Sequence, residues 1–185
     1  MEKVLTPAII NRIIDLKGRE SFSLALSLED TIKKDPSIVK RMIAIQERYA
    51  KLIKKCRVIL REIQSSRKSR GDPLLKWSMA KSIVDFIEST EKEGFYITNI
   101  SNALSRDLKV SVRQINYLKE FARSFPKIEM INPKISWDKY KEILDIKSKQ
   151  MQKECIRKIL AGELRTREDI RKFKRLHKNF NRSRL

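Results

Sequence analysis

The sequence contains very little glycine and proline, with 4 Gly and 5 Pro among 185 residues. Proteins built from many strands and tight turns need more of both, because these residues adopt the backbone conformations that turns require. Charged residues make up 36% of the chain, and the 41% that are apolar recur at helical spacing. The composition predicts an all-α fold of several helices, in one domain or in two small ones that share a core.

Residues that carry catalytic and metal chemistry are also scarce. The chain has one histidine, His177, and two distant cysteines, Cys56 and Cys155, which cannot complete a structural zinc site. It has no glycine-rich phosphate loop. We expect no enzyme activity, no cofactor and no metal, and we expect the cysteines to be buried thiols. The alternative is a metal held on one helical face by Asp138, Glu142 and Asp145.

Acidic residues are outnumbered, with 23 Asp and Glu against 43 Lys and Arg, so that the formal net charge is +20. Such an excess strains a compact fold unless a polyanion relieves it. Double-stranded DNA is the expected partner, and an anionic membrane surface is second. The sequence has no run of 18 apolar residues and no apolar signal-peptide segment, so we expect a cytoplasmic protein, associated with the nucleoid if the source is prokaryotic.

The stretch from 97 to 125 predicts two short helices joined by a turn at Lys109 and Val110. Thr98 or Asn99 is expected to cap the first helix. Ser111 is expected to cap the second, with Gln114 completing a capping box. The inward positions at helical spacing are Ile100, Ala103, Leu104, Leu108, Val112, Ile115, Leu118 and Ala122.

Four side chains point outward from the start of this second helix, namely Ser111, Arg113, Gln114 and Tyr117. This layout is typical of a helix-turn-helix, whose second helix presents its first residues to base edges in the major groove. Arginine can donate two hydrogen bonds to guanine, and glutamine can pair with adenine. An ordinary helical hairpin with a solvated polar face is the alternative.

Basic residues elsewhere are candidates for contact with the DNA backbone. They lie in the basic segment 67–73, beside the predicted turn, and in the tail from Arg171, which has no acidic residue. The candidates are Arg67, Lys68, Arg70, Arg106, Lys109, Arg123, Arg171, Lys172, Lys174, Arg175, Lys178, Arg182 and Arg184.

Residues 37–65 form the longest predicted helix. Apolar residues spaced alternately four and three apart make a heptad seam of Ile38, Met42, Ile45, Tyr49, Leu52, Cys56, Ile59 and Ile63. A seam of this kind is typical of a coiled coil, so we expect a homodimer through residues 38–63. The alternative is a helix buried in its own domain, which Ile53 and Leu60 favour because they widen the stripe.

The predicted organisation has four parts: an N-terminal helical region over 1–66, a basic linker over 67–73, a helical domain with the helix-turn-helix over 74–173, and a basic tail over 174–185. Further helices are expected over 7–17, 27–33, 74–90, 136–147 and 149–162, with a short one from Thr166 and a small extended arm over 127–132. We expect the tail to be at least partly disordered when unbound.

The order of segments from Lys76 to Phe173 resembles the helical N-terminal domain of YhcG-type proteins, which usually precedes a PDDEXK nuclease domain. The segments that carry the resemblance are residues 104–108 (LSRDL), 112–126, which end in Phe-Pro, and 135–144 (ISWDKYKEIL). More loosely, the order is similar to the helix-turn-helix domain of ParB and KorB partition proteins, with 166–168 (TRE) as a further matching piece. The resemblance implies DNA binding. It implies neither nuclease nor nucleotide-hydrolysing activity, because we find no PDDEXK domain and no ParB nucleotide-binding motif in the sequence.

Overall fold

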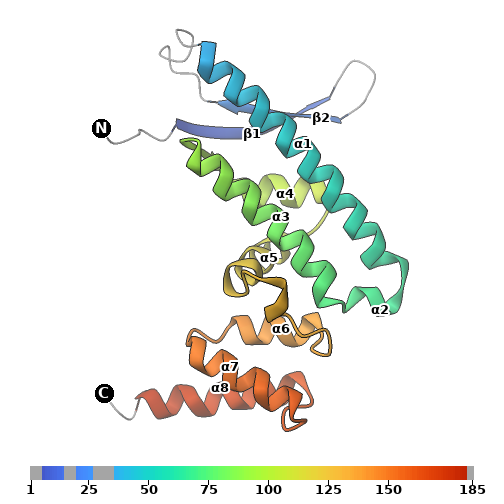
Figure 1. Cartoon of the computed structure of the whole chain (residues 1–185), viewed down its shortest axis with the longest axis vertical. Helices are drawn as coiled ribbons and strands as arrows, with labels where there is room; N and C mark the ends of the chain where they lie inside the picture. The colour runs from blue at the N-terminus through green and yellow to red at the C-terminus, as the bar shows by residue number, and fades with distance from the viewer. Residues whose placement is uncertain (1–5, 15–19, 27–35, 183–185) are drawn as a thin grey trace. The chain divides into compact units, whose positions relative to one another are not determined.

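The computed structural model describes residues 6–14, 20–26 and 36–182 (Figure 1). From residue 36 to 182 the regular structure is helical apart from one short strand and one 3-10 turn, which confirms the predicted all-α, multi-helix fold there. The helices are α1 (Pro36–Ser65), α2 (Arg67–Arg70), α3 (Pro73–Lys92), α4 (Ile100–Leu108), α5 (Val112–Ser124), α6 (Trp137–Leu144), α7 (Lys149–Leu160) and α8 (Arg167–Arg182), and the 3-10 turn is η2 (Ile128–Met130).

A three-stranded sheet precedes and interrupts these helices. Its strands are β1 (Thr6–Ile14), β2 (Glu20–Leu26) and β3 (Phe95–Thr98), in the order β2-β1-β3. The helix predicted over 7–17 is wrong for the residues of β1. Isoleucine is β-branched and favours strands, and β1 pairs antiparallel with β2 and parallel with β3. The helix predicted over 27–33 lies outside the described residues.

The chain forms two compact units, one of Met1–Arg61 with Met79–Lys119 and the other of Glu62–Ser78 with Glu120–Leu185. The division therefore does not follow the predicted linker over 67–73. That segment is a helical connection, in which α2 is followed by Asp72, whose Oδ1 accepts the Leu74 N–H at 2.8 Å and caps α3. The polar, glycine- and proline-containing composition suits a tight connection between two helices as well as it suits a linker.

In the first unit, the heptad seam of α1 is buried within the chain itself. Its side chains from Ile45 to Ile59 are at most 8% exposed, and so are those of Ile53 and Leu60. The Tyr49 ring lies 5.6 Å from that of Phe86 in α3. From Ile45 to Ile59 the surface assigned to a homodimer is thus packed inside the chain's own core.

A buried polar contact ties α4 to α1 in the same unit. Asp107 is 1% exposed, and its Oδ2 accepts a hydrogen bond of 2.6 Å from the Tyr49 hydroxyl. Arg57 donates to the Asp107 carbonyl at 3.0 Å. Burial raises the pKa of Tyr49, and so does the bond to Asp107, so the hydroxyl stays a donor. Within the described residues the other carboxylate oxygen, Oδ1, has no hydrogen-bond partner.

The second unit is organised around an aromatic cluster. Phe121 lies 5.0 Å from Tyr140 and 5.1 Å from Trp137, measured between ring centroids. The Trp77 indole N–H donates to the Phe125 carbonyl at 2.6 Å. The cluster packs the C-terminal end of α5 against α6, because aromatic side chains bury a large area at preferred tilted geometries.

The C-terminal part departs from prediction in three places. Helix α8 continues to Arg182, so the basic tail predicted to be partly disordered is helical up to that residue. Leu160, which helical spacing in the predicted helix 149–162 places among the buried residues, is 46% exposed. Residues 128–130 form η2, where an extended arm was expected. The predicted N-terminus of α8 is confirmed, since Thr166 and Asp169 exchange hydrogen bonds of 2.8 and 3.1 Å.

The Tyr49–Asp107 contact generates a stability prediction. Tyr49→Phe should lower the free energy of unfolding by roughly 1–3 kcal/mol, because it leaves a second oxygen of a buried carboxylate without a donor. The matched control is Tyr96→Phe, whose ring is 49% exposed; it should change the value by less than about 0.5 kcal/mol. Urea unfolding followed by circular dichroism measures both, and equal effects would contradict the structural role of Tyr49.

Candidate nucleic-acid interface

The turn between α4 and α5 is held by its own hydrogen bonds. Lys109 adopts the left-handed conformation, with φ 54°, which is uncommon for a residue other than glycine. The Val110 N–H donates to the Ser105 carbonyl at 3.1 Å, and the Ser105 hydroxyl donates to the Val110 carbonyl at 2.6 Å. These bonds satisfy groups at the end of α4 and allow α5 to begin after only three intervening residues.

The two predicted helix caps have different outcomes. The Ser111 Oγ accepts the Gln114 N–H at 3.2 Å, so the predicted cap of α5 is confirmed. Asn99 occupies the cap position of α4, but its side chain makes no capping bond. The reason is its left-handed backbone, with φ 53°, whereas a capping side chain normally extends from the β region.

One face of α5 is buried in the core, so the opposite face points outward. Ile115 and Leu118 are both fully buried. Arg113 is exposed, while Gln114 and Tyr117 are half-buried. The Arg113 guanidinium donates to the Tyr117 hydroxyl at 3.2 Å and lies 5.5 Å from the centre of its ring. Two of the predicted base-reading residues are therefore in contact, one turn apart.

The sequence analysis did not identify Asn116, a polar residue of α5 close to Arg113 in the sequence. Lys119 donates to the Ser101 hydroxyl at 2.7 Å, and this hydroxyl donates to the Asn116 Oδ1 at 3.0 Å. The chain of bonds orients the exposed Asn116 amide one turn after Arg113 and links α4 to α5. The position of Asn116 three residues after Arg113 places it on the same face of the helix, and this spacing could have identified it from the sequence.

The candidate backbone-contacting cations are divided between the two units. Arg106 and Lys109, in the first, are exposed, as are Arg70, Arg123 and Lys172 in the second. The helices α2 and α8 include four candidates whose side chains lie outside the description, Arg67, Lys68, Lys178 and Arg182, and Arg184 lies outside the described residues.

Three other candidates, all in α8, have acidic partners, and Arg106 also lies 3.8 Å from the carboxylate of Asp107. Arg171 and Lys174 of α8 each lie 2.8 Å from a carboxylate oxygen of Glu142 in α6, whose side chain is 7% exposed. Lys174 also pairs with Asp145 at 3.0 Å, and Arg175 pairs with Glu168. Arg171 and Lys174 hold α8 to α6, whereas Arg175 pairs within α8 itself. Their assignment as phosphate contacts stays a prediction. Glu142 and Asp145 lie about 30 residues before Arg171 and Lys174 in the sequence, so the sequence alone did not indicate their pairing.

The same contacts fix the protonation of Glu142. Burial raises the pKa of its carboxyl, but hydrogen bonds from Arg171, Lys174 and Arg167 outweigh burial and lower the pKa to about 2. The carboxylate is therefore ionised at neutral pH. Asp138, also considered as a metal ligand, pairs with Lys141 at 2.6 Å instead.

Within the described ranges the chain shows neither a metal-binding cluster nor a membrane-spanning helix. No group of three His, Cys, Asp or Glu side chains there is placed to hold a metal ion, and no helix is long and apolar enough to cross a membrane. Cys56 and Cys155 are buried free thiols, as predicted, and burial raises their pKa values to about 12 and about 11.

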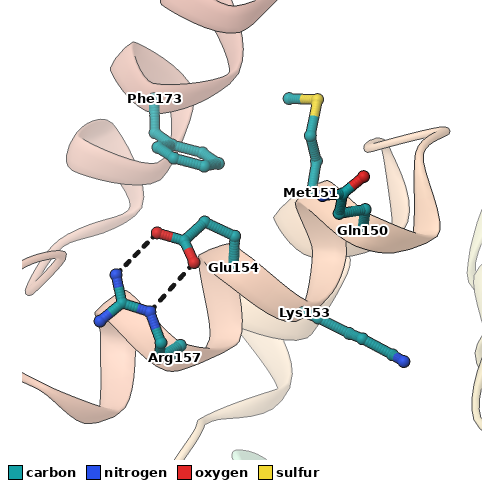
Figure 2. Close-up of a pocket in the computed structure, with 6 residues that line it drawn as sticks. All are labelled: Gln150, Met151, Lys153, Glu154, Arg157 and Phe173. Carbon is teal, nitrogen blue, oxygen red and sulfur yellow. Dashed lines mark hydrogen bonds and ion pairs between the residues drawn. The ribbon is translucent and has the colours of Figure 1, made fainter.

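A hollow of about 500 Å³ lies between α7 and α8 (Figure 2). The Phe173 ring forms one side, and the Glu154–Arg157 ion pair, at 2.7 Å, lies on its rim. Its remaining lining residues are Gln150, Met151 and Lys153. This set contains no paired nucleophile and base, so the hollow offers no catalytic arrangement.

The ion network predicts a pH dependence of stability. Because the pKa of Glu142 is lower in the folded chain than its ordinary value of 4.5, its stabilising effect is complete above pH 4.5 and is lost as the pH falls towards about 2. Glu142→Gln should cost roughly 1–3 kcal/mol at pH 7 and should weaken the acid-induced loss. Urea unfolding at pH 7 and pH 3 measures this.

The matched control for Glu142→Gln is Asp138→Asn, at a side chain that is 56% exposed. Its ion pair should contribute at most about 1 kcal/mol at pH 7. If Glu142→Gln and the wild type lost the same free energy of unfolding between pH 7 and pH 3, the stabilising role of the Glu142 ion pairs would be contradicted.

Comparisons with known protein families, with curated proteins and with solved structures find no match to this chain.

Proposed function

We propose that this protein binds duplex DNA without catalysing a reaction, through α4 and α5 acting as a helix-turn-helix. The observation that carries the proposal is the start of α5. Ser111 caps the helix, while Arg113, Gln114 and Tyr117 project from its first two turns without being needed in the core. A recognition helix presents its first residues to base edges in this way.

The chemistry of these side chains and the charge of the chain support the same proposal. Arginine, glutamine and asparagine can each make two hydrogen bonds to one base edge. Contact with Tyr117 restricts the orientations of Arg113, which reduces the entropy lost on binding. The net charge of +20 favours a polyanion over a neutral ligand.

The resemblance to YhcG-type and ParB/KorB domains agrees with this function and extends the proposal to partition, transcriptional control or a mobile element. Such a role places the protein in the cytoplasm, on the nucleoid of a prokaryote. Helix-turn-helix domains commonly bind two half-sites as dimers. A homodimer here would need a surface other than the buried seam of α1.

The second candidate function is a basic helical adaptor within a replication or nucleoprotein assembly. The observation that favours it is the Glu142 network, in which cations hold two helices together and are therefore less available to DNA. In that case the remaining charge would meet only the DNA backbone, without sequence preference.

Selection of bound fragments from a random duplex pool tests the proposed function and separates the two candidates. An enriched motif supports base readout by α5. Binding without enrichment supports the adaptor, and no retention of duplex at all would refute both.

Substitutions on α5 provide a sharper prediction. Arg113→Ala should weaken binding to the selected site by about 1–3 kcal/mol and affect random DNA little, because a base contact is lost. Arg123→Ala, at an exposed position near the other end of α5, should weaken both about equally. Fluorescence anisotropy on both duplexes measures this. Identical patterns for the two variants would contradict readout by Arg113.

A further inference from the structure

Several helical cations in the described ranges form an ion pair with an acidic side chain, but one helical stretch contains no acidic residue in its sequence. Lys81 pairs with Asp85 at 2.5 Å, and Lys158 pairs with Glu163. In α1, residues 48–61 contain six Lys or Arg and no Asp or Glu. This stretch differs from α8, whose cations reach acids of α6.

Four of these six cations are exposed, Lys51, Lys54, Lys55 and Arg61, and we call them the α1 stripe. The other two have partners, since Arg48 pairs with Glu93 and Arg57 donates to the Asp107 carbonyl. Among the described residues no acidic side chain forms an ion pair with a member of the stripe.

The stripe lies opposite the buried seam of α1. Ile45, Leu52 and Ile59 occupy the covered face, so the side chains of the stripe are held outward by the packing of the same helix. From Lys51 to Arg61 the helix rises about 15 Å, roughly half a turn of duplex DNA. One rigid helix thus carries a row of positive charge on the scale of several phosphates.

Folding alone does not explain this arrangement. Like charges three or four residues apart repel on a helix, as for Lys51 with Lys54 and with Lys55. A polyanion removes that repulsion and releases its own counterions on contact. Flexible lysines are suited to phosphates as point charges, without reading sequence.

We propose that the α1 stripe is a second DNA-binding surface, which contacts the phosphate backbone of duplex DNA. The proposal rests on the proposed function. It adds a binding surface outside α5, on a helix whose opposite face is buried in the core.

The test compares two triple variants that remove the same charge. Lys51→Gln/Lys54→Gln/Lys55→Gln alters the stripe. The control, Lys134→Gln/Lys147→Gln/Lys153→Gln, alters exposed lysines of the other unit. Anisotropy titrations between 50 and 200 mM salt use the selected duplex and a random one, and thermal unfolding is measured without DNA.

We expect the stripe variant to bind both duplexes roughly 10- to 100-fold more weakly, with the slope of log affinity against log salt reduced by about 2–3. The control should change affinity much less. The stripe variant should melt at the wild-type temperature or above it, because repulsion has been removed. Equal losses in both triple variants, or a lower melting temperature in the stripe variant, would overturn the proposal.

Two further measurements distinguish the α1 stripe from α5 as the binding surface, and DNA from a membrane as the partner. If Arg113→Ala has no effect at the selected site while the stripe variant binds more weakly, base readout fails and the stripe stands. If the wild type binds no duplex, the proposed function itself fails. Stripe-dependent binding to vesicles of phosphatidylserine, with duplex binding unchanged, would assign the stripe to a membrane surface and overturn this inference.

Discussion

The excess of positive charge is the constraint on which the rest of this structure depends. With 43 basic and 23 acidic residues, the chain cannot neutralise itself, so the positions of the acids decide which cations are structural. Glu142 illustrates this, because one nearly buried carboxylate receives Arg167, Arg171 and Lys174 and thereby fixes α8 on α6. Where acids are missing from the local sequence, as in residues 48–61, four of the six cations stay exposed.

The proposed DNA-binding face depends on the hydrophobic core behind it. Ile115 and Leu118 orient α5, and Tyr49 bonded to Asp107 anchors α4 to α1. The turn between α4 and α5 is stabilised by Ser105. The rigid positioning of outward side chains is what allows a helix to read bases, since a contact misplaced by an ångström loses its hydrogen bonds.

Local patterns in the sequence predicted the helices well, because helical periodicity and capping depend on neighbours within one or two turns. The long helix, the Ser111 cap and the Thr166–Asp169 capping box were all readable in this way. The same patterns failed for β1, where isoleucines at mixed spacing suited a helix or a strand, and where the parallel partner β3 is distant in sequence. Likewise, the heptad seam had the period of a coiled coil but is covered by the chain itself.

The sequence by itself determined the helical composition, the charge, the two short helices on either side of Lys109, the Ser111 cap and the side chains that point outward from α5. Tertiary structure decided which surfaces remain available. It buried the seam of α1, joined Arg171 and Lys174 to Glu142, and linked Lys119, Ser101 and Asn116. The physical reason is that a cation's availability depends on which acid folding brings within a few ångströms, and that pairing is set by packing between distant segments.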